Sequence, residues 1–165
     1  MIVIVEGIDR VGKSTFCKLL TEYGYKILDS KIHTQKTDVD SVVYDRLQEE
    51  RTVAQAQLLS LLDTSEKIVI DRFHLSQYIY GFIDRQRDTS LHMMDLENLL
   101  LHNTVLVYIM PTNIYISSQQ HGSDLIEHHR LFEEAFNMSK LKKYKGSYYD
   151  LDKLLHIILE ADNGN

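Results

Sequence analysis

The sequence predicts an α/β fold, a three-layer α/β/α sandwich in which helices cover both faces of a five-stranded parallel sheet. Three observations favour this fold. Short apolar runs recur between longer stretches of helical spacing, and a glycine-rich segment links the first run to the first helical stretch. A third is the composition, because a chain of 165 residues that is 44% hydrophobic and 25% charged is typical of one globular domain. We expect a single domain over residues 1–165.

The strands are expected at the apolar runs, because segments that are apolar on both faces are typical of a buried parallel sheet. The first run is followed directly by the glycine-rich segment, and the fourth ends at the only proline, Pro111. The last run is the weakest of the five. The expected strands are residues 2–5, 25–28, 68–70, 105–110 and 148–151.

Helices are expected wherever apolar residues recur at intervals of three and four. The first of these helices ends at Gly24, where a left-handed residue is favoured. A basic run at Lys140, Lys142, Lys143 and Lys145 is expected near the end of a long helix, on its solvated face. The expected helices are residues 16–23, 39–47, 52–62, 75–83, 91–101, 124–144 and 153–160.

The charge balance excludes function classes that depend on bulk attraction to a polyanion. Asp and Glu number 24 against 18 Lys and Arg, for a net charge of −6, so any polyanion must bind in a local pocket. The apolar start of the chain meets Glu6 far short of the ~20 residues that span a bilayer. The single cysteine, Cys17, cannot form an internal disulfide. We therefore expect a cytoplasmic protein.

Residues 7–14, Gly-Ile-Asp-Arg-Val-Gly-Lys-Ser, lie between the first expected strand and the first expected helix. Two glycines five positions apart, followed by Lys and Ser, are the pattern of a phosphate-binding loop. Glycines let backbone N–H groups point at an anion, and the helix N-terminus adds a positive dipole. Lys13 would bring a full charge to the terminal phosphates. The segment predicts a bound nucleoside triphosphate.

Two oxygen-bearing side chains suggest a Mg²⁺ ion beside this loop. Ser14 can supply its hydroxyl to a metal that bridges two phosphates. Asp71 follows the third apolar run, at the edge of the sheet where ligands of α/β folds gather, and would hold the metal directly or through water. Arg72 follows it. An Asp-Arg pair at a strand end is common on surfaces, so the phosphate loop is what favours a functional interpretation.

Two segments resemble the thymidylate kinases, within the wider family of P-loop nucleoside and nucleotide kinases. Residues 5–15, Val-Glu-Gly-Ile-Asp-Arg-Val-Gly-Lys-Ser-Thr, resemble the opening of these enzymes. Residues 71–80, Asp-Arg-Phe-His-Leu-Ser-Gln-Tyr-Ile-Tyr, are similar to the family's Asp-Arg-aromatic segment with its later Ser and Tyr. The expected topology agrees over most of the chain. The short length is reminiscent of virus-encoded nucleotide kinases.

The resemblance implies transfer of the γ-phosphoryl group of ATP, with Mg²⁺, to a deoxynucleoside monophosphate, thymidylate or a related pyrimidine, for dNTP synthesis. It implies that Arg72 contacts the acceptor phosphate, that Asp9 approaches the acceptor sugar and that Arg10 stabilises the transferring group. Family members with this loop arginine tend to lack lid arginines, and the expected short lid, residues 117–127, contains none. Arg130 lies just beyond it, where helix movement could bring it to the phosphates.

The site residues expected on this basis fall into four groups. The catalytic residues are Lys13, Arg10 and Asp71, and the metal ligands are Ser14 and Asp71. The ATP-binding residues are Gly7, Asp9, Arg10, Gly12, Lys13, Ser14 and Thr15. The acceptor-binding residues are Asp9, Lys31, Arg72, Phe73 and Tyr80.

The acceptor side departs from the family pattern in two places. The family usually has an arginine-containing, proline-rich loop after the second strand, where this chain has Asp-Ser-Lys-Ile-His at 29–33, leaving Lys31 as the substitute. The helix that lines the base pocket lacks the usual aromatic residue and arginine over residues 57–63. Base recognition would then use Phe73, Tyr78, Gln55 or Gln57, and the preferred base stays open.

Two other functions stay open. A phosphate acceptor is largely ionised at neutral pH and needs no general base, whereas a nucleoside hydroxyl does. Asp29 could accept that proton, so a deoxynucleoside kinase is the alternative. A regulatory P-loop ATPase is the third hypothesis, although the chain has no Asn-Lys-x-Asp signature. An apolar helix face is expected either in the core or in a homodimer interface; its residues are Met93, Met94, Leu96, Leu99 and Leu100.

Overall fold

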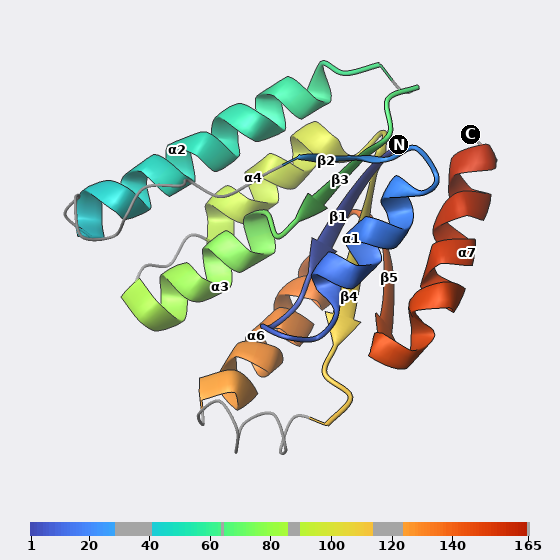
Figure 1. The fold of residues 1–165 in the computed structure, drawn as a ribbon. Helices are drawn as coiled ribbons and strands as arrows, with labels where there is room; N and C mark the ends of the chain where they lie inside the picture. The colour runs from blue at the N-terminus through green and yellow to red at the C-terminus, as the bar shows by residue number, and fades with distance from the viewer. Residues whose placement is uncertain (29–40, 64, 86–89, 114–123, 165) are drawn as a thin grey trace.

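The computed structural model describes residues 1–28, 41–63, 65–85, 90–113 and 124–164 (Figure 1). Its centre is a parallel sheet with the strand order β2-β3-β1-β4-β5. The predicted α/β class with a five-stranded parallel sheet is confirmed. The strands are β1 (Ile2–Glu6), β2 (Lys26–Leu28), β3 (Ile68–Asp71), β4 (Thr104–Met110) and β5 (Lys142–Ser147).

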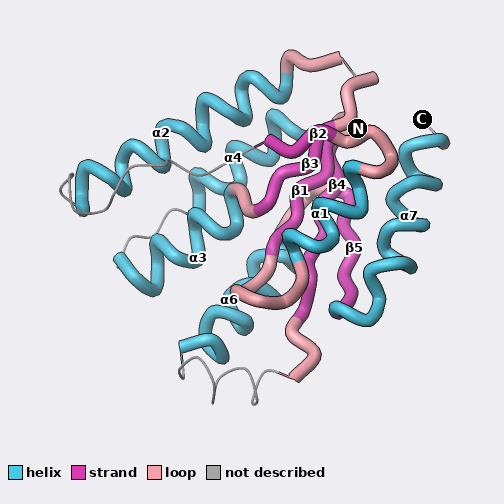
Figure 2. Tube along the Cα trace, in the orientation of Figure 1, coloured by secondary structure: helices cyan, strands magenta, loops and turns pink. Residues whose placement is uncertain are grey.

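Figure 2 shows helices, in cyan, on both sides of the sheet, whose strands are magenta. One group consists of α1 and α7, which contact each other, and in the other group α3 contacts α2, α4 and α6. No helix in the described ranges is both long and apolar enough to cross a membrane. The helices are α1 (Lys13–Thr21), α2 (Ser41–Ser60), α3 (His74–Arg85), α4 (Ser90–Leu100), α6 (Asp124–Met138) and α7 (Leu151–Asn163).

The central strand explains how the two sequence motifs meet. All five residues of β1 are buried, with β3 paired on one side and β4 on the other. In this register Val5 pairs with Asp71 and Glu6 pairs with Tyr108. Because parallel strands end at the same edge, the loop after β1 and the Asp71-Arg72 pair after β3 lie together there.

The predicted end of the chain was wrong in its boundaries. The helix expected over 124–144 ends at Met138, and the last strand lies over Lys142–Ser147 instead of 148–151. Residues Tyr148–Asp150 form one turn of 3₁₀ helix that leads into α7. The sequence pattern does not reveal this strand because β5 lies at the sheet edge and its residues other than Gly146 are exposed or half-buried, so they need not be apolar.

The basic run therefore lies largely on a strand, not on a helix face. Lys143 Nζ donates to the carbonyl oxygens of Phe136, Asn137 and Ser139 at 2.8–2.9 Å. These carbonyls lie at the end of α6, where backbone acceptors lack helical partners, so Lys143 caps this helix.

Other helix predictions were confirmed in part. The described parts of the segments expected over 39–47 and 52–62 fall within or next to one continuous helix, α2, and Leu58 on it is 65% exposed. On α4, Met93, Leu96 and Leu100 belong to the core of the chain itself, which confirms the first of the two alternatives for these three residues. A homodimer and a cytoplasmic location stay predictions.

Candidate active site

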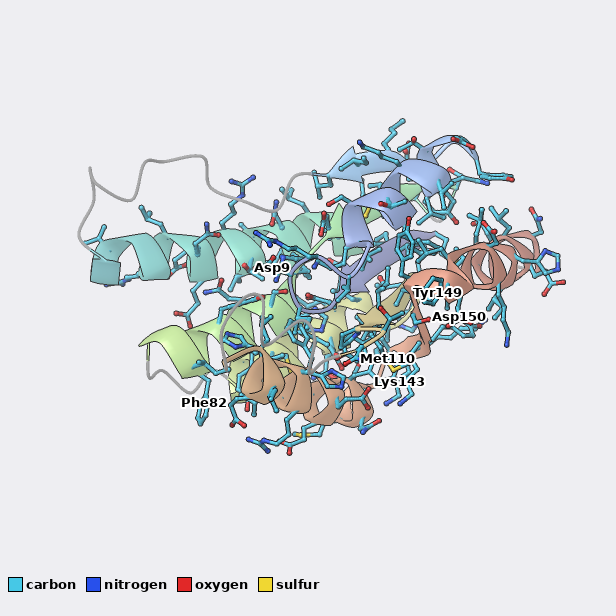
Figure 3. All side chains as sticks on the ribbon, turned by 60° about the horizontal axis from the view of Figure 1, so that its bottom comes forward. Asp9, Phe82, Met110, Lys143, Tyr149 and Asp150 are labelled. Atoms are coloured by element: carbon cyan, nitrogen blue, oxygen red, sulfur yellow. The ribbon has the colours of Figure 1, made fainter. Side chains whose placement is uncertain are left out.

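The loop between β1 and α1 borders a cavity of about 380 Å³ at the carboxyl edge of the sheet. Figure 3 shows Asp9 on this loop and Tyr149 in the turn that precedes α7. Every predicted ATP-binding residue except Gly7 lines the cavity. The lining consists of Asp9, Arg10, Gly12, Lys13, Ser14 and Thr15 from the loop and α1, Asp71 and Arg72 after β3, and Tyr148 before α7.

Both motif glycines occupy positions that other residues would not fit. Their φ angles are +141° at Gly7 and +98° at Gly12, a region in which a Cβ atom is strained. A Cβ on Gly7 would lie 2.5 Å from the carbonyl oxygen of Ile109, and one on Gly12 would lie 2.6 Å from the Tyr148 ring. The loop can therefore follow this path only with glycine at both positions.

Lys13 holds its ammonium group in a buried setting. Lys13 is the first residue of α1 and is only 6% exposed. Its ammonium group donates to the carbonyl oxygen of Ile8. Burial, together with the charge of Arg72, lowers the pKa of Lys13 to about 8, although the carboxylates of Asp71, Asp9 and Glu6 oppose this shift. A bound phosphate would add negative charge beside this buried ammonium group and favour its charged form, as expected of a phosphate-binding lysine.

Ser14 and Asp71, the two side chains that the sequence predicts as metal ligands, are in contact. The Ser14 hydroxyl donates to Asp71 Oδ2 at 2.7 Å, and both residues line the cavity. A hydroxyl and a carboxylate beside a phosphate loop fit Mg²⁺, which takes few protein ligands and shares the rest with phosphates and water. When bound, the ion would neutralise charge on the donor phosphates.

Two arginines at the cavity have a left-handed backbone. The φ angles are +65° at Arg10 and +69° at Arg72, and residues with a Cβ adopt this region at a cost of roughly 1–2 kcal/mol. Such conformations persist where surrounding contacts enforce them and are common at functional sites. At Arg72 one such contact is its N–H, which donates to the carbonyl oxygen of Val5 at 2.9 Å.

The Arg72 side chain contacts two other residues that were predicted to bind the acceptor, Asp9 and Tyr80. Its guanidinium group pairs with the Asp9 carboxylate and lies over the Tyr80 ring, 5.0 Å from the ring centroid. Arg72 Nη1 also donates to the Ser76 hydroxyl at 3.4 Å. Burial opposes the charge, but Tyr80, Asp9 and Glu6 outweigh it and raise the pKa of Arg72. The arginine stays charged at the edge of the cavity.

Other predicted residues lie elsewhere. Phe73 is only 4% exposed, belongs to the core and meets the His74 ring edge-on, so it does not border the cavity. Lys31, Asp29 and residues 117–123 of the expected lid lie outside the described residues, whereas residues 124–127 form the first turn of α6. Arg130 is paired with Glu127 and Glu134 on its own helix.

The sequence analysis missed one residue that lines this cavity and one that lies behind it. Tyr148 lines the cavity and packs on Gly12, whereas the apolar pattern places its segment in a strand. Glu6 is fully buried and accepts hydrogen bonds from residues that follow Arg72. The available signal for Glu6 was an acidic residue at the end of an otherwise apolar strand, a position where a buried carboxylate requires partners.

The strand order, the glycine loop after β1 and the Asp-Arg pair after β3 define the chain as having the P-loop fold of nucleoside and nucleotide kinases. No protein-family model matches the sequence. A search of curated proteins finds no match either. The similarity is therefore to solved structures of low sequence identity, and it shows the fold.

Three of these structures illustrate the likeness. The YorR protein from Bacillus subtilis, solved in complex with phosphorylated GDP, has a TM-score of 0.74 at 18% identity and covers 100% of this chain and 99% of its own. Thymidylate kinase from Ehrlichia chaffeensis has a TM-score of 0.67 at 17% identity, over 96% of this chain and 98% of its own. Deoxyadenosine kinase from M. mycoides has a TM-score of 0.62 at 18% identity over 100% of both chains.

Proposed function

We propose that this protein is a deoxynucleoside monophosphate kinase that transfers the γ-phosphoryl group of ATP to thymidylate or a related pyrimidine monophosphate. The observation that carries the proposal is the placement of Arg72. This residue borders the same cavity as the phosphate loop and the start of the Lys13 helix, and its guanidinium group pairs with Asp9. A second phosphate docked on Arg72 would face the donor phosphates held by the loop.

The state of the cavity's carboxylates favours a phosphate acceptor over a sugar hydroxyl. Asp9 pairs with Arg72, and Asp71 accepts the Ser14 hydroxyl. A nucleoside hydroxyl needs a carboxylate that takes its proton, whereas a monophosphate, with a second pKa of about 6, attacks already ionised. Both described carboxylates of the cavity are thus engaged by other side chains. A monophosphate acceptor, which needs no general base, fits this arrangement better than a nucleoside hydroxyl.

The reaction needs alignment and neutralisation of charge. An oxygen of the acceptor phosphate attacks the γ-phosphorus, the bond to the bridging oxygen breaks, and ADP leaves. Lys13 and Arg10 line the phosphate region and would neutralise charge that spreads over the equatorial oxygens. Arg72 would hold the acceptor in line, and Asp9 would fix both Arg72 and the acceptor sugar.

The names of the structural neighbours support the class of reaction and leave the acceptor open. They include thymidylate kinases and a deoxyadenosine kinase, the latter solved with dCMP and dCDP. A deoxynucleoside kinase is therefore the second candidate, favoured by that neighbour. For either acceptor, we propose that the enzyme is cytoplasmic and supplies dNTP synthesis.

A coupled assay of ADP release distinguishes the candidates. ATP and Mg²⁺ are supplied with thymidine, deoxycytidine and the common and modified pyrimidine deoxynucleoside monophosphates. We expect turnover with a monophosphate and none with the nucleosides. Turnover with nucleosides alone would refute the proposal, and ADP release without any acceptor would favour a regulatory ATPase. Arg72→Ala is expected to raise the KM of the acceptor far more than the KM of ATP.

A further inference from the structure

We propose that Glu6 is a positioning residue for phosphoryl transfer, which holds Arg72 at a fixed place relative to the phosphate loop. The inference rests on the proposed function and adds a residue that the two motifs did not assign. Glu6 itself does not line the cavity. It acts through the first turn of α3, which supports Arg72.

The contacts of Glu6 are those of a buried anion at a helix start. The residue is 0% exposed, and its Oε1 accepts from the N–H groups of Phe73 at 2.8 Å, Leu75 at 3.1 Å and Ser76 at 3.2 Å. Its Oε2 accepts from the Ser76 hydroxyl. The first N–H groups of a helix lack helical partners and favour a negative charge, so one carboxylate satisfies several donors of α3 at once.

These contacts enclose Arg72 on both sides along the backbone. The Arg72 N–H donates to the carbonyl oxygen of Val5, and the N–H of the next residue, Phe73, donates to Glu6. The last two residues of β1 thus hold the peptide groups that flank a residue at φ +69°. A left-handed conformation at a residue with a Cβ requires such enforcement.

Glu6 also reaches the Arg72 side chain through Ser76. The Ser76 hydroxyl donates to Glu6 and accepts from Arg72 Nη1 at 3.4 Å. Tyr80, one turn further along α3, lies under the guanidinium group. Asp9, which pairs with the guanidinium group, has a side chain that is 70% exposed, and water weakens an ion pair on that side. The connection through Ser76 ends on a fully buried carboxylate and therefore helps to fix the position of the arginine.

Glu6 directly precedes the phosphate loop, which relates its support of Arg72 to the alignment of donor and acceptor. The next residue, Gly7, begins the phosphate loop, so the donor loop and the support of the acceptor arginine are built on adjacent residues of one central strand. Phosphoryl transfer depends on the alignment of donor and acceptor, and a displacement of ~1 Å can lower a rate by ~10²-fold. Removing the charge of Glu6 would loosen Arg72 while the loop keeps its own glycine geometry.

A second buried glutamate provides the matched control. Glu97 on α4 is also 0% exposed, contacts His74 Nε2 at 2.9 Å and accepts from the N–H of Lys140 at 2.7 Å. It contacts the same turn of α3 through His74, but its hydrogen bonds do not reach the Phe73 N–H or the Ser76 hydroxyl that link Glu6 to Arg72, and it does not line the cavity. If Glu6 only stabilises the fold, Glu6→Gln and Glu97→Gln should change the same properties.

The test compares both variants with the wild-type protein in the ADP-release assay, with thermal unfolding and ATP calorimetry alongside. We expect both variants to lower Tm. At a temperature where both are folded, Glu6→Gln should raise the acceptor KM by ~10-fold and lower kcat by about 10-fold or more, with the Kd of ATP within about 2-fold of wild type. Glu97→Gln should leave all three constants within about 2-fold.

A double-variant cycle tests whether Glu6 acts through Arg72. In the Arg72→Ala background, Glu6→Gln should raise the acceptor KM no further, because the group it positions is gone. Additive effects would overturn the inference, and so would a folded Glu6→Gln variant with wild-type kinetics. If Glu6→Gln fails to fold, Ser76→Ala removes only the hydroxyl link; a several-fold rise in the acceptor KM supports the inference, and no change overturns it.

The wild-type protein separates the proposed function from this inference. Absence of wild-type turnover with every monophosphate refutes the proposed function and this inference with it. Wild-type turnover together with unaffected Glu6→Gln kinetics refutes this inference alone.

Discussion

Burial of the Lys13 ammonium group predicts that Lys13→Met stabilises the ligand-free protein while it abolishes phosphoryl transfer. Burial lowers the pKa of Lys13 from 10.5 to about 8. A difference of this size corresponds to about 3 kcal/mol of destabilisation of the charged form at pH 7. Methionine fills similar space without charge, but it leaves the Ile8 carbonyl without its donor, which costs about 1 kcal/mol or more. We expect a net gain of about 1–2 kcal/mol.

The stability difference between Lys13→Met and the wild-type protein should depend on pH in a direction that can be measured. Below pH 8 the lysine is protonated in both the folded and the unfolded chain, so the destabilisation is constant. Between pH 8 and 10.5 the unfolded chain keeps a proton that the folded chain has lost, so the contribution of Lys13 to stability becomes less unfavourable as pH rises. The advantage of Lys13→Met over wild type should therefore shrink between about pH 7 and pH 9.5.

The assay is urea unfolding of the ligand-free proteins at about pH 7, 8 and 9.5. The matched control is Lys18→Met, at an exposed lysine of the same helix, which should change the free energy of unfolding by less than about 0.5 kcal/mol. With saturating ATP and Mg²⁺ the order should reverse, because only the wild type gains stability from binding. A Lys13→Met protein that is less stable than wild type at pH 7, or an advantage independent of pH, would refute the reasoning.

Three further predictions concern single residues. Arg10→Ala should lower kcat by ~10²-fold in steady-state assays with ATP binding retained, and a silent variant would remove Arg10 from transition-state stabilisation. Gly12→Ala should weaken ATP binding in calorimetry by ~10-fold or more, because its Cβ would meet the Tyr148 ring at 2.6 Å and its φ is +98°. Cys17 is buried and burial raises the pKa of its thiol to about 12, so a thiol reagent should label it only after denaturation.

Much of the fold could be predicted because its determinants are local. The central strands β1, β3 and β4 are buried along most of their length on both faces of the sheet, so most of their residues are apolar, and that pattern is visible in the sequence. The edge strand β5, with the sequence Lys-Lys-Tyr-Lys-Gly-Ser, is under no such requirement, and its basic residues resemble the solvated end of a helix. Because the last strand was predicted over residues 148–151, Tyr148 was not predicted to line the cavity.

The sequence by itself determined the place of the glycine loop, its lysine and serine, and the Asp71-Arg72 pair, because each is a contiguous pattern tied to the end of an apolar strand. Only the tertiary structure decided which distant groups support them. Glu6 meets its partners at separations of 67 to 70 residues, and Tyr148 covers Gly12 from the far end of the chain. Such contacts depend on strand order and register, which place residues together without any periodic signal along the chain.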